Sequence, residues 1–464
     1  MKLLKAFCLL TVFGILLPLL LSSCGGTPGT ESSPAPVSET SGTPEPAESS
    51  AEPSEDPASS ETPDKPKPSA EAYRSGPAPE LAPDVNHLKG IRVLGSAFTS
   101  QQGKAAVVGT CDDGVTVRAE TKYGTTEAVS FYGYFALSVD CPEPSVIVTL
   151  TEWYGGEKIG KATGLDCKPV KPGSDMWGTF VGNHSQMFLE KAVPEFTGQT
   201  KLNDKQVENF RKKIADRVEK AKDIGDGCEL IYVIIPSAMT AYPEDVPEEY
   251  KAGEVTRYTQ MMEAINAAGA TAVDLRPIYR AARNDELPVY YRTDSHWSEY
   301  GAYLAYVAVF DIISERFPEA APRTFEEFDW TAGQYQSGDM VYYLEMSNSV
   351  VREREWLRTP NFDLPAGLKK FARYNGGDSL AYGAFTSTAI NGTTLKTGNR
   401  SLPDVTVFRD SYAAQLMDIV AERCNVSYWP AMWSYTWNIA QLKKDEPDYV
   451  IYFVSEWNAG NLIT

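Results

Sequence analysis

The sequence has few histidines, no closely spaced cysteine pair and fewer basic than acidic residues. Its 464 residues include only three histidines, and none of the seven cysteines forms a Cys-x-x-Cys pair. These counts argue against a His-rich metal site, a zinc ribbon and a thioredoxin-type motif. Basic residues are also in deficit, because 43 Lys and Arg face 62 Asp and Glu, a formal charge of −19. Since nucleic acids and anionic membrane surfaces favour a basic face, we expect neither as the main partner.

Apolar residues, by contrast, are plentiful enough for more than one folded domain. Hydrophobic residues make up 42% of the chain and aromatic residues 11%, with nine Trp and 25 Tyr. A chain of 464 residues is too long for one compact domain and suits two or three. We therefore expect an acidic globular protein with a sizeable core.

The N-terminus has the features of an export signal, residues 1–23. Two lysines precede an apolar run that is short for a lasting transmembrane helix and is closed by small residues. The sequence Leu-Ser-Ser-Cys-Gly at residues 21–25 resembles a bacterial lipobox, which implies cleavage before Cys24 and attachment of a diacylglycerol to its thiol. The alternative is an ordinary signal peptide with an incidental cysteine. No later stretch is apolar enough to span a membrane, so we expect an extracytoplasmic lipoprotein anchored to the cell membrane by lipid.

The segment that follows, residues 24–80, has the composition of a tether. Pro, Ser, Thr, Glu and Gly fill most of it, and Leu, Ile, Phe and Trp are absent. Such a segment buries too little apolar surface to offset the entropy of ordering it. Proline and charge repulsion keep it extended. We predict a disordered spacer between the lipid anchor and the folded part.

Residues 85–170 have the pattern of a small β-sandwich. Short runs rich in β-branched and aromatic residues are separated by Gly, Asp, Asn and Pro at regular spacing. The layout resembles bacterial immunoglobulin-like modules. Two functions stay open, glycan or cell-wall binding and simple spacing of the next domain. A disulfide is permitted outside the cytosol, but the three thiols in this region cannot all pair: Cys111, Cys141 and Cys167.

From residue 174 to residue 464 strand and helix patterns alternate. An amphipathic helix is predicted over 202–222, and a largely apolar one over 299–317. The predicted buried strands are residues 230–236, 271–275, 405–408 and 449–454. Such alternation indicates an α/β domain with a mostly parallel sheet flanked by helices.

Two segments that carry reactive side chains lie at predicted strand or helix ends, where α/β proteins collect their sites. Asp294 and His296 precede the apolar helix, and Ser411 follows a strand. A serine hydroxyl becomes a nucleophile when an imidazole removes its proton, and a carboxylate sets the tautomer of that imidazole. The backbone N–H of Ser411, at a strand-to-helix turn, is then available as an oxyanion donor. By itself a lone Asp-x-His pair is weak evidence, since such pairs are common in surface turns.

Longer matches strengthen this hypothesis. The segment Arg-Thr-Asp-Ser-His-Trp-Ser-Glu-Tyr-Gly-Ala that begins at Arg292 closely resembles the Asp-x-His-Trp block of SGNH-hydrolase-like proteins in the alginate O-acetyltransferase and DHHY group. The serine block of that group lies C-terminal to the Asp/His block, as Arg-Asp-Ser-Tyr at 409–412 does here. Weaker matches follow the order of the group at 176–182, 232–247 and 446–456, so the resemblance covers about 175–464. Two positions depart from it: Tyr412 replaces the usual Phe, and Trp457 stands where an arginine is often found.

The resemblance implies an SGNH-like fold and O-acetyl transfer to a cell-envelope or exported polysaccharide, with no cofactor. Ser411 would be the nucleophile, His296 the general base and then acid, and Asp294 the orienting carboxylate. The group commonly works with a membrane-bound O-acyltransferase that delivers acetyl groups, which would suit a lipid-anchored domain. Two alternatives remain: a carbohydrate esterase that uses the same triad, and a non-catalytic glycan-binding lipoprotein.

Several neighbours of these blocks have two interpretations. Asp410 is predicted to cap the helix after Ser411 rather than to react. Arg409 and Tyr412 are candidates for oxyanion or substrate contacts, although Arg409 is as well suited to pairing with an acid. Gly338-Asp339 resembles a further block of the family and is predicted as a turn at the edge of the site. Aromatic side chains gather nearby and suit either sugar stacking or a core: Tyr428, Trp429, Trp433, Tyr435 and Trp437.

Overall fold

The computed structural model describes residues 68–171, 178–334, 338–347, 350–365, 368 and 392–463. The chain divides into two units, Met1–Lys65 and Pro66–Thr464, and the described residues all belong to the second. The predicted signal peptide, Cys24 and most of the predicted tether lie outside the described residues, as do Met176 and Trp177 of the weak entry match. None of the described helices combines the length and the apolar character that crossing a bilayer requires.

The chain is already ordered before residue 80, where the predicted tether ends. Residues Ala70–Tyr73 form a short 3₁₀ helix, η1, and the ring of Tyr73 is buried in the core of the α/β domain. Arg74 pairs with Asp285, to which its Nε donates at 3.0 Å, and the Tyr300 hydroxyl accepts from Ser75 N at 3.1 Å. Tyr73 and Arg74 thus anchor residues 68–80 to the α/β domain by apolar burial and an ion pair.

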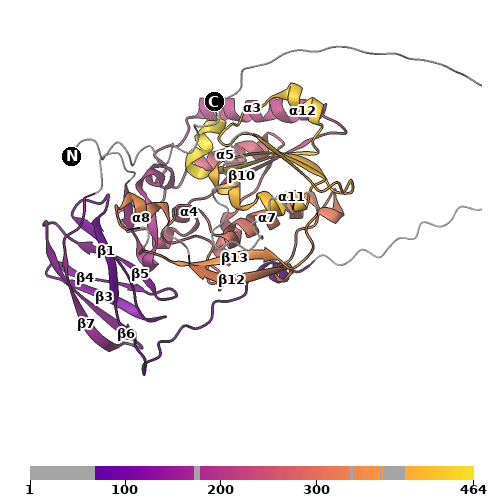
Figure 1. Ribbon diagram of the computed structural model, residues 1–464. Coiled ribbons are helices and arrows are strands. Elements are labelled where there is room, and N and C mark those ends of the chain that lie inside the picture. Colours follow the sequence, from indigo (N-terminus) through magenta and orange to yellow (C-terminus); the bar gives the residue numbers. More distant parts are fainter. Residues whose placement is uncertain are drawn as a thin grey trace, which may run out of the picture. The chain divides into compact units, whose positions relative to one another are not determined.

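Seven strands form two antiparallel sheets that pack as a sandwich, as predicted (Figure 1). Alternate residues face inward, and the enclosed core includes the three buried, unbridged cysteines Cys111, Cys141 and Cys167. The strands of the first sheet are β1 (Arg92–Phe98), β2 (Lys104–Thr110) and β5 (Tyr134–Asp140). Those of the second are, in spatial order, β4 (Gly124–Val129), β3 (Thr116–Thr121), β6 (Val146–Tyr154) and β7 (Glu157–Cys167).

The second part of the chain is built on a six-stranded sheet, which confirms the predicted α/β class. The order is β11-β10-β17-β15-β16-β14, parallel except for β14 at one edge. Three of these strands, β10, β15 and β17, are nearly continuous runs of buried residues, as expected where helices cover both faces. The bounds are β10 (Glu229–Ile235), β11 (Thr271–Ala272), β14 (Thr393–Lys396), β15 (Asp404–Arg409), β16 (Val426–Trp429) and β17 (Tyr449–Ser455).

Helices cover the two faces of this sheet with separate cores (Figure 1). On one face lie α3 (Asp204–Ala221) and α5 (Arg257–Ala267), packed on Tyr232 and Tyr452. On the other face lie α6 (Arg276–Ala281), α7 (Glu299–Ile313) and α11 (Met417–Glu422). The predicted helix over 202–222 is confirmed by α3. This helix begins after Asn203, because the Asn203 side chain closes a capping box with Gln206. The shorter helices are α2 (Val193–Phe196), α4 (Ala238–Ala241), α8 (Asp339–Tyr343) and α12 (Ile439–Asp445).

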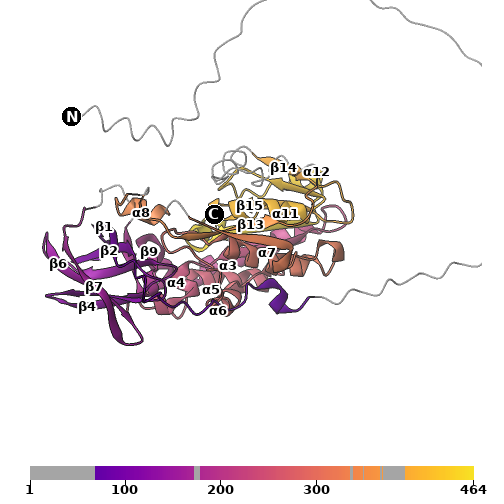
Figure 2. The same cartoon turned by 60° about the horizontal axis from the view of Figure 1, so that its bottom comes forward.

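The β-sandwich packs against the α/β domain through a shared hydrophobic cluster, and α8 lies beside it in Figure 2. Ala106 and Tyr134 of the sandwich meet Met187 and Met340 in this cluster. Two further antiparallel strand pairs belong to the α/β part: β8 (Thr179–Val181) with β9 (Met187–Leu189), and β12 (Phe328–Gln334) with β13 (Arg354–Pro360). The ring of Phe131, in the turn before β5, lies 3.6 Å under the guanidinium of Arg292. The sandwich therefore contacts the residue that begins the Asp/His block.

Candidate active site

The serine block sits at the carboxyl end of β15, in the middle of the sheet. Ser411 begins a 3₁₀ helix, η7 (Ser411–Gln415), and the Asp410 side chain caps it by accepting from Tyr412 N at 3.1 Å. The predicted capping role of Asp410 is thus confirmed. The other carboxylate oxygen of Asp410 accepts from Ser455 N at 2.8 Å and from Asn458 Nδ2 at 3.1 Å. Asp410 therefore fixes the nucleophile turn to the end of β17.

The Asp/His block forms the turn that leads into α7. Ser298 caps this helix by accepting from the N–H groups of Tyr300 and Gly301, each at 3.1 Å. Gly301 allows a close approach, because a Cβ there would lie 2.3 Å from the Val289 carbonyl oxygen. The buried indole of Trp297 donates to the Tyr412 carbonyl at 3.0 Å. That bond ties the Asp/His block directly to the serine block.

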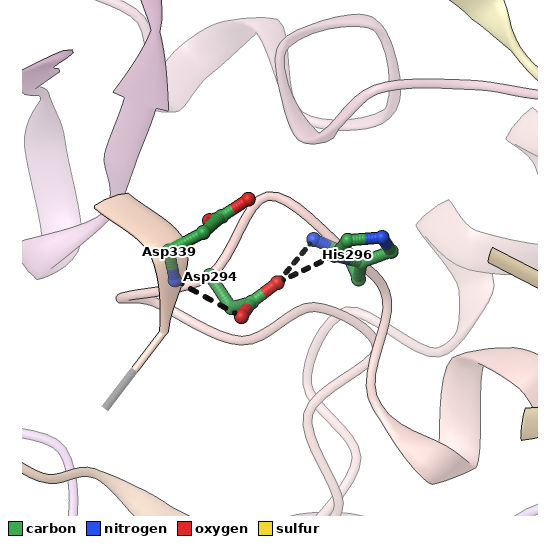
Figure 3. A group of neighbouring side chains, drawn as sticks. All are labelled: Asp294, His296 and Asp339. Carbon is green, nitrogen blue, oxygen red and sulfur yellow. Dashed lines mark hydrogen bonds and ion pairs between the residues drawn. The ribbon is translucent and has the colours of Figure 1, made fainter. Parts of the chain in front are cut away.

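The structure brings the three predicted catalytic side chains into one hydrogen-bonded line. Asp294 Oδ1 accepts from His296 Nδ1 at 2.7 Å and from the His296 backbone N–H at 2.9 Å (Figure 3). Ser411 Oγ lies 2.9 Å from His296 Nε2. Because the carboxylate can only accept, Nδ1 carries the proton and Nε2 is the acceptor for the serine hydroxyl. This arrangement can activate Ser411 as a nucleophile.

The electrostatic surroundings of His296 stabilise its protonated form more than water stabilises that of a free imidazole. Burial lowers the pKa of His296, but the charge and hydrogen bond of Asp294 and the charges of Asp339 and Asp410 outweigh it, so the pKa is raised. The His296 side chain is 16% exposed and that of Asp294 8% exposed. A partly dry imidazole surrounded by carboxylates is suited to accept a proton and hold it during a reaction.

Two other predicted site residues, Arg409 and Tyr412, are buried behind the catalytic side chains. Arg409 is fully buried, and its Nη1 donates to the Asp410 carbonyl at 3.1 Å and contacts Met432 Sδ at 3.4 Å. The Tyr412 ring is also buried and lies 4.5 Å from the His296 ring, with its hydroxyl bonded to the Ser295 carbonyl. Both side chains therefore bind backbone carbonyls of the two catalytic blocks and are not exposed to a substrate. Trp457, in place of the expected arginine, packs edge-on against Tyr412 with ring centroids 5.4 Å apart.

The aromatic cluster at 428–437 is partly core. Trp429 is fully buried and Tyr435 nearly so, whereas Trp433 is 55% exposed. The backbone N–H of Trp433 donates to the Arg409 carbonyl at 2.9 Å, which places it beside the end of β15. Its φ of 63° lies in the left-handed region, which a bulky side chain rarely adopts. Trp433 and Tyr435 are both candidate substrate contacts, and of these two Trp433 is the one with an exposed ring.

Two carboxylates of the site were not predicted as functional. Glu353 is buried and accepts from Arg292 N at 2.7 Å and from Thr293 N at 2.8 Å, and burial raises its pKa. Asp339 accepts from Ser295. Both lie 44 residues or more along the chain from the groups they bind, so no local spacing reveals them; the Gly338-Asp339 block was the single available signal.

Asp294, His296 and Asp339 are also the described residues whose ligand atoms lie close enough to hold a metal ion, all within 4.8 Å of one another. Oxygen and imidazole ligands suit a divalent cation. However, Asp294 Oδ1 is engaged by His296, and both oxygens of Asp339 accept hydrogen bonds from Ser295. These oxygens are therefore already engaged in the hydrogen bonds that hold the turn.

Comparisons with known proteins find similarity to acetyltransferases. Residues 194–364 match the family described as SGNH hydrolase-like domain, acetyltransferase AlgX. A probable alginate O-acetylase AlgJ of Pseudomonas syringae pv. tomato is 26% identical over 185 residues, 39% of this chain and 44% of the relative. The resemblance inferred from the two sequence blocks is confirmed. The chain spans only 44% of the length of this relative, and Ser411 lies beyond the family match, so its place rests on the geometry above.

Two solved structures are similar at low identity. Bacillus cereus PatB1 is 15% identical, with a TM-score of 0.48, over 62% of this chain and 99% of that protein. The O-acetyltransferase domain of Pseudomonas putida AlgJ is 16% identical, with a TM-score of 0.38, over 62% of this chain and 93% of that domain.

Proposed function

We propose that this chain transfers acetyl groups to hydroxyls of a cell-envelope or exported polysaccharide through an acetyl-Ser411 intermediate. The observation that carries the proposal is the line of hydrogen bonds from Asp294 through His296 to Ser411, at 2.7 and 2.9 Å, in a chain that matches an acetyltransferase domain. The acceptor class comes from the alginate O-acetylase similarity of the same domain. Cys24 would hold the protein to the outer face of the cell membrane, where a membrane-bound O-acyltransferase would supply acetyl groups.

The reaction divides into two acyl transfers that use the same groups. In the first, His296 Nε2 takes the Ser411 proton while Oγ attacks the acetyl carbonyl, and the imidazolium then protonates the leaving donor alcohol. In the second, a sugar hydroxyl passes its proton to His296 and attacks the acetyl carbon, and Ser411 Oγ leaves with that proton. Asp410 occupies the N–H of Tyr412, so the N–H of Ser411 at the start of η7 is our candidate oxyanion donor.

Product analysis separates transfer from hydrolysis. The mature chain would be incubated with an activated acetyl ester, with and without an oligosaccharide acceptor, while intact mass follows the enzyme and the products are identified. We expect one acetyl on the protein and acetylated sugar as the main product when acceptor is present. Free acetate alone, at a rate unchanged by any acceptor, would make the protein an esterase. No adduct and no turnover would indicate a glycan-binding protein instead.

We expect Trp433→Ala to weaken acceptor binding selectively. The apolar C–H face of a pyranose packs on an exposed indole, and such aromatic contacts contribute roughly 0.5–1.5 kcal/mol, so KM for the oligosaccharide should rise about 2- to 12-fold. Alanine keeps the left-handed backbone of the residue, so thermal stability should change little. Steady-state kinetics with varied acceptor measures the effect, and the rate of Ser411 acetylation by a small ester is followed separately.

Tyr154→Ala is a matched control for this variant, since Tyr154 is an exposed aromatic residue (38%) on β6 of the sandwich. Trp433→Phe should retain most of the wild-type affinity. If Trp433→Ala and Tyr154→Ala had the same KM as the wild type, Trp433 would not be part of the acceptor site.

A further inference from the structure

Gly338 and Asp339 dock onto the turn that carries the catalytic carboxylate. Gly338 N donates to Thr293 Oγ1 at 3.1 Å, and Met340 N donates to the Thr293 carbonyl at 3.1 Å. Between them, Asp339 N donates to Asp294 Oδ2 at 3.2 Å, the carboxylate oxygen that His296 does not use (Figure 3). A Cβ on Gly338 would lie 2.3 Å from Asp294 Cα and Cβ, so this approach requires glycine.

The Asp339 side chain also binds this turn, through its carboxylate. One carboxylate oxygen accepts from Ser295 N at 2.8 Å and the other from Ser295 Oγ at 2.6 Å. Ser295 is the residue between Asp294 and His296, so these bonds set the direction in which both catalytic side chains leave the backbone. Charge-assisted hydrogen bonds to a fixed N–H are short and directional, which makes Asp339 an effective clamp.

We propose that Asp339 is a positioning residue: it locks the Asp294–Ser295–His296 turn, and its charge adds to that of Asp294 in stabilising the imidazolium that forms during acyl transfer. The role in acyl transfer rests on the proposed function, whereas the effect on the imidazole does not. Asp339 has its carboxylate within 4.8 Å of the His296 nitrogen that belongs to this cluster. An opposite charge at about 4–6 Å favours the protonated imidazole appreciably.

The surroundings of Asp339 determine the pH range in which this charge is present. Burial and the negative charge of Asp294 raise the pKa of Asp339 to about 6, while His296 and the hydrogen bonds from Ser295 oppose the shift. Burial raises the pKa of Tyr343 on the same helix, and the charges of Asp339 and Asp294 add to this shift. His296 also faces Asp410 from the serine block. Above pH 6, Asp339 is therefore ionised and stabilises protonated His296.

The test is Asp339→Asn, which keeps the shape of the side chain and removes its charge. The three histidines of the chain make an NMR titration practical, with the His296 resonance assigned from its loss in His296→Ala. We expect the pKa of His296 in the wild type to lie above the ordinary value of 6.5, and that of the variant to be lower by about one unit. The acid limb of the pH–rate profile should move to lower pH by the same amount, and kcat should fall about tenfold.

The control is Asp329→Asn, an exposed carboxylate on β12, which should leave both readouts unchanged. Ser295→Ala removes one of the two clamping bonds and no charge, so it should lower kcat without shifting the His296 titration. A folded Asp339→Asn variant with an unchanged His296 titration would overturn the proposal. Because the titration needs no substrate, it stays informative if the chain proves to have no acetyl transfer activity, so the two proposals fail separately.

Discussion

Replacement of Ser411 by alanine is expected to abolish the acetyl-enzyme and nearly all turnover. Ser411 Oγ lies 2.9 Å from His296 Nε2, so removal of this hydroxyl takes the nucleophile away from the first step. In other serine enzymes, loss of the nucleophile lowers kcat by roughly 10³- to 10⁶-fold. Intact-mass spectrometry with an activated acetyl ester measures the adduct, and initial rates with the same ester measure turnover.

Ser401→Ala serves as the control, because Ser401 is an exposed serine shortly before β15 and should behave as the wild type. His296→Ala should be about as inactive as Ser411→Ala, and the double variant no worse than either, since residues that act as a unit are strongly non-additive. An adduct that persisted in Ser411→Ala would place the nucleophile elsewhere, and the proposed mechanism would then be wrong.

The sequence predicted those parts of the fold that local patterns encode. The apolar spacing of α3 and the buried runs of β10 and β17 are properties of short segments. They were sufficient to predict the α/β class with helices on both faces. The two catalytic blocks were found for a similar reason, because each is a short motif with its own chemistry. Their meeting at 2.9 Å needed only the rule that site residues gather at strand ends.

What the sequence did not reveal depends on contacts between distant segments. Nothing near Asp339 or Glu353 marks them as partners of the 292–295 turn, because the hydrogen bonds join segments 44 to 61 residues apart. The aromatic cluster is a second example, since its density does not tell which rings face outward. Trp429 is buried as part of β16, whereas Trp433 lies on the following loop and is exposed. The burial of Tyr73 likewise depends on the core of the α/β domain, which no property of residues 68–80 reveals.

Asp294→Asn is expected to leave the fold intact and to remove most of the activity. An amide has one accepting and one donating end, but Asp294 accepts on both oxygens: from His296 at Oδ1 and from Asp339 N at Oδ2. If the amide nitrogen faces His296, the imidazole must place its proton on Nε2 and can no longer accept the Ser411 proton. If it faces Asp339, two N–H donors oppose each other 3.2 Å apart and the turn is pushed open. Either way the imidazole loses the carboxylate charge that helps raise its pKa.

The expected loss in kcat is roughly 10³- to 10⁴-fold, as for the same substitution in other serine triads. Single-turnover acetylation of Ser411 measures it, nitrogen-15 NMR of His296 reports the tautomer, and thermal unfolding checks the fold. A loss of kcat below about tenfold, which corresponds to about 1.36 kcal/mol in activation free energy, would contradict the assignment of Asp294 as the orienting group. The double variant Asp294→Asn/Asp339→Asn then discriminates between the two carboxylates. If Asp339 acts only by holding the turn that presents Asp294, its replacement should cost far less once Asp294 has already lost its charge, because the group it positions no longer functions.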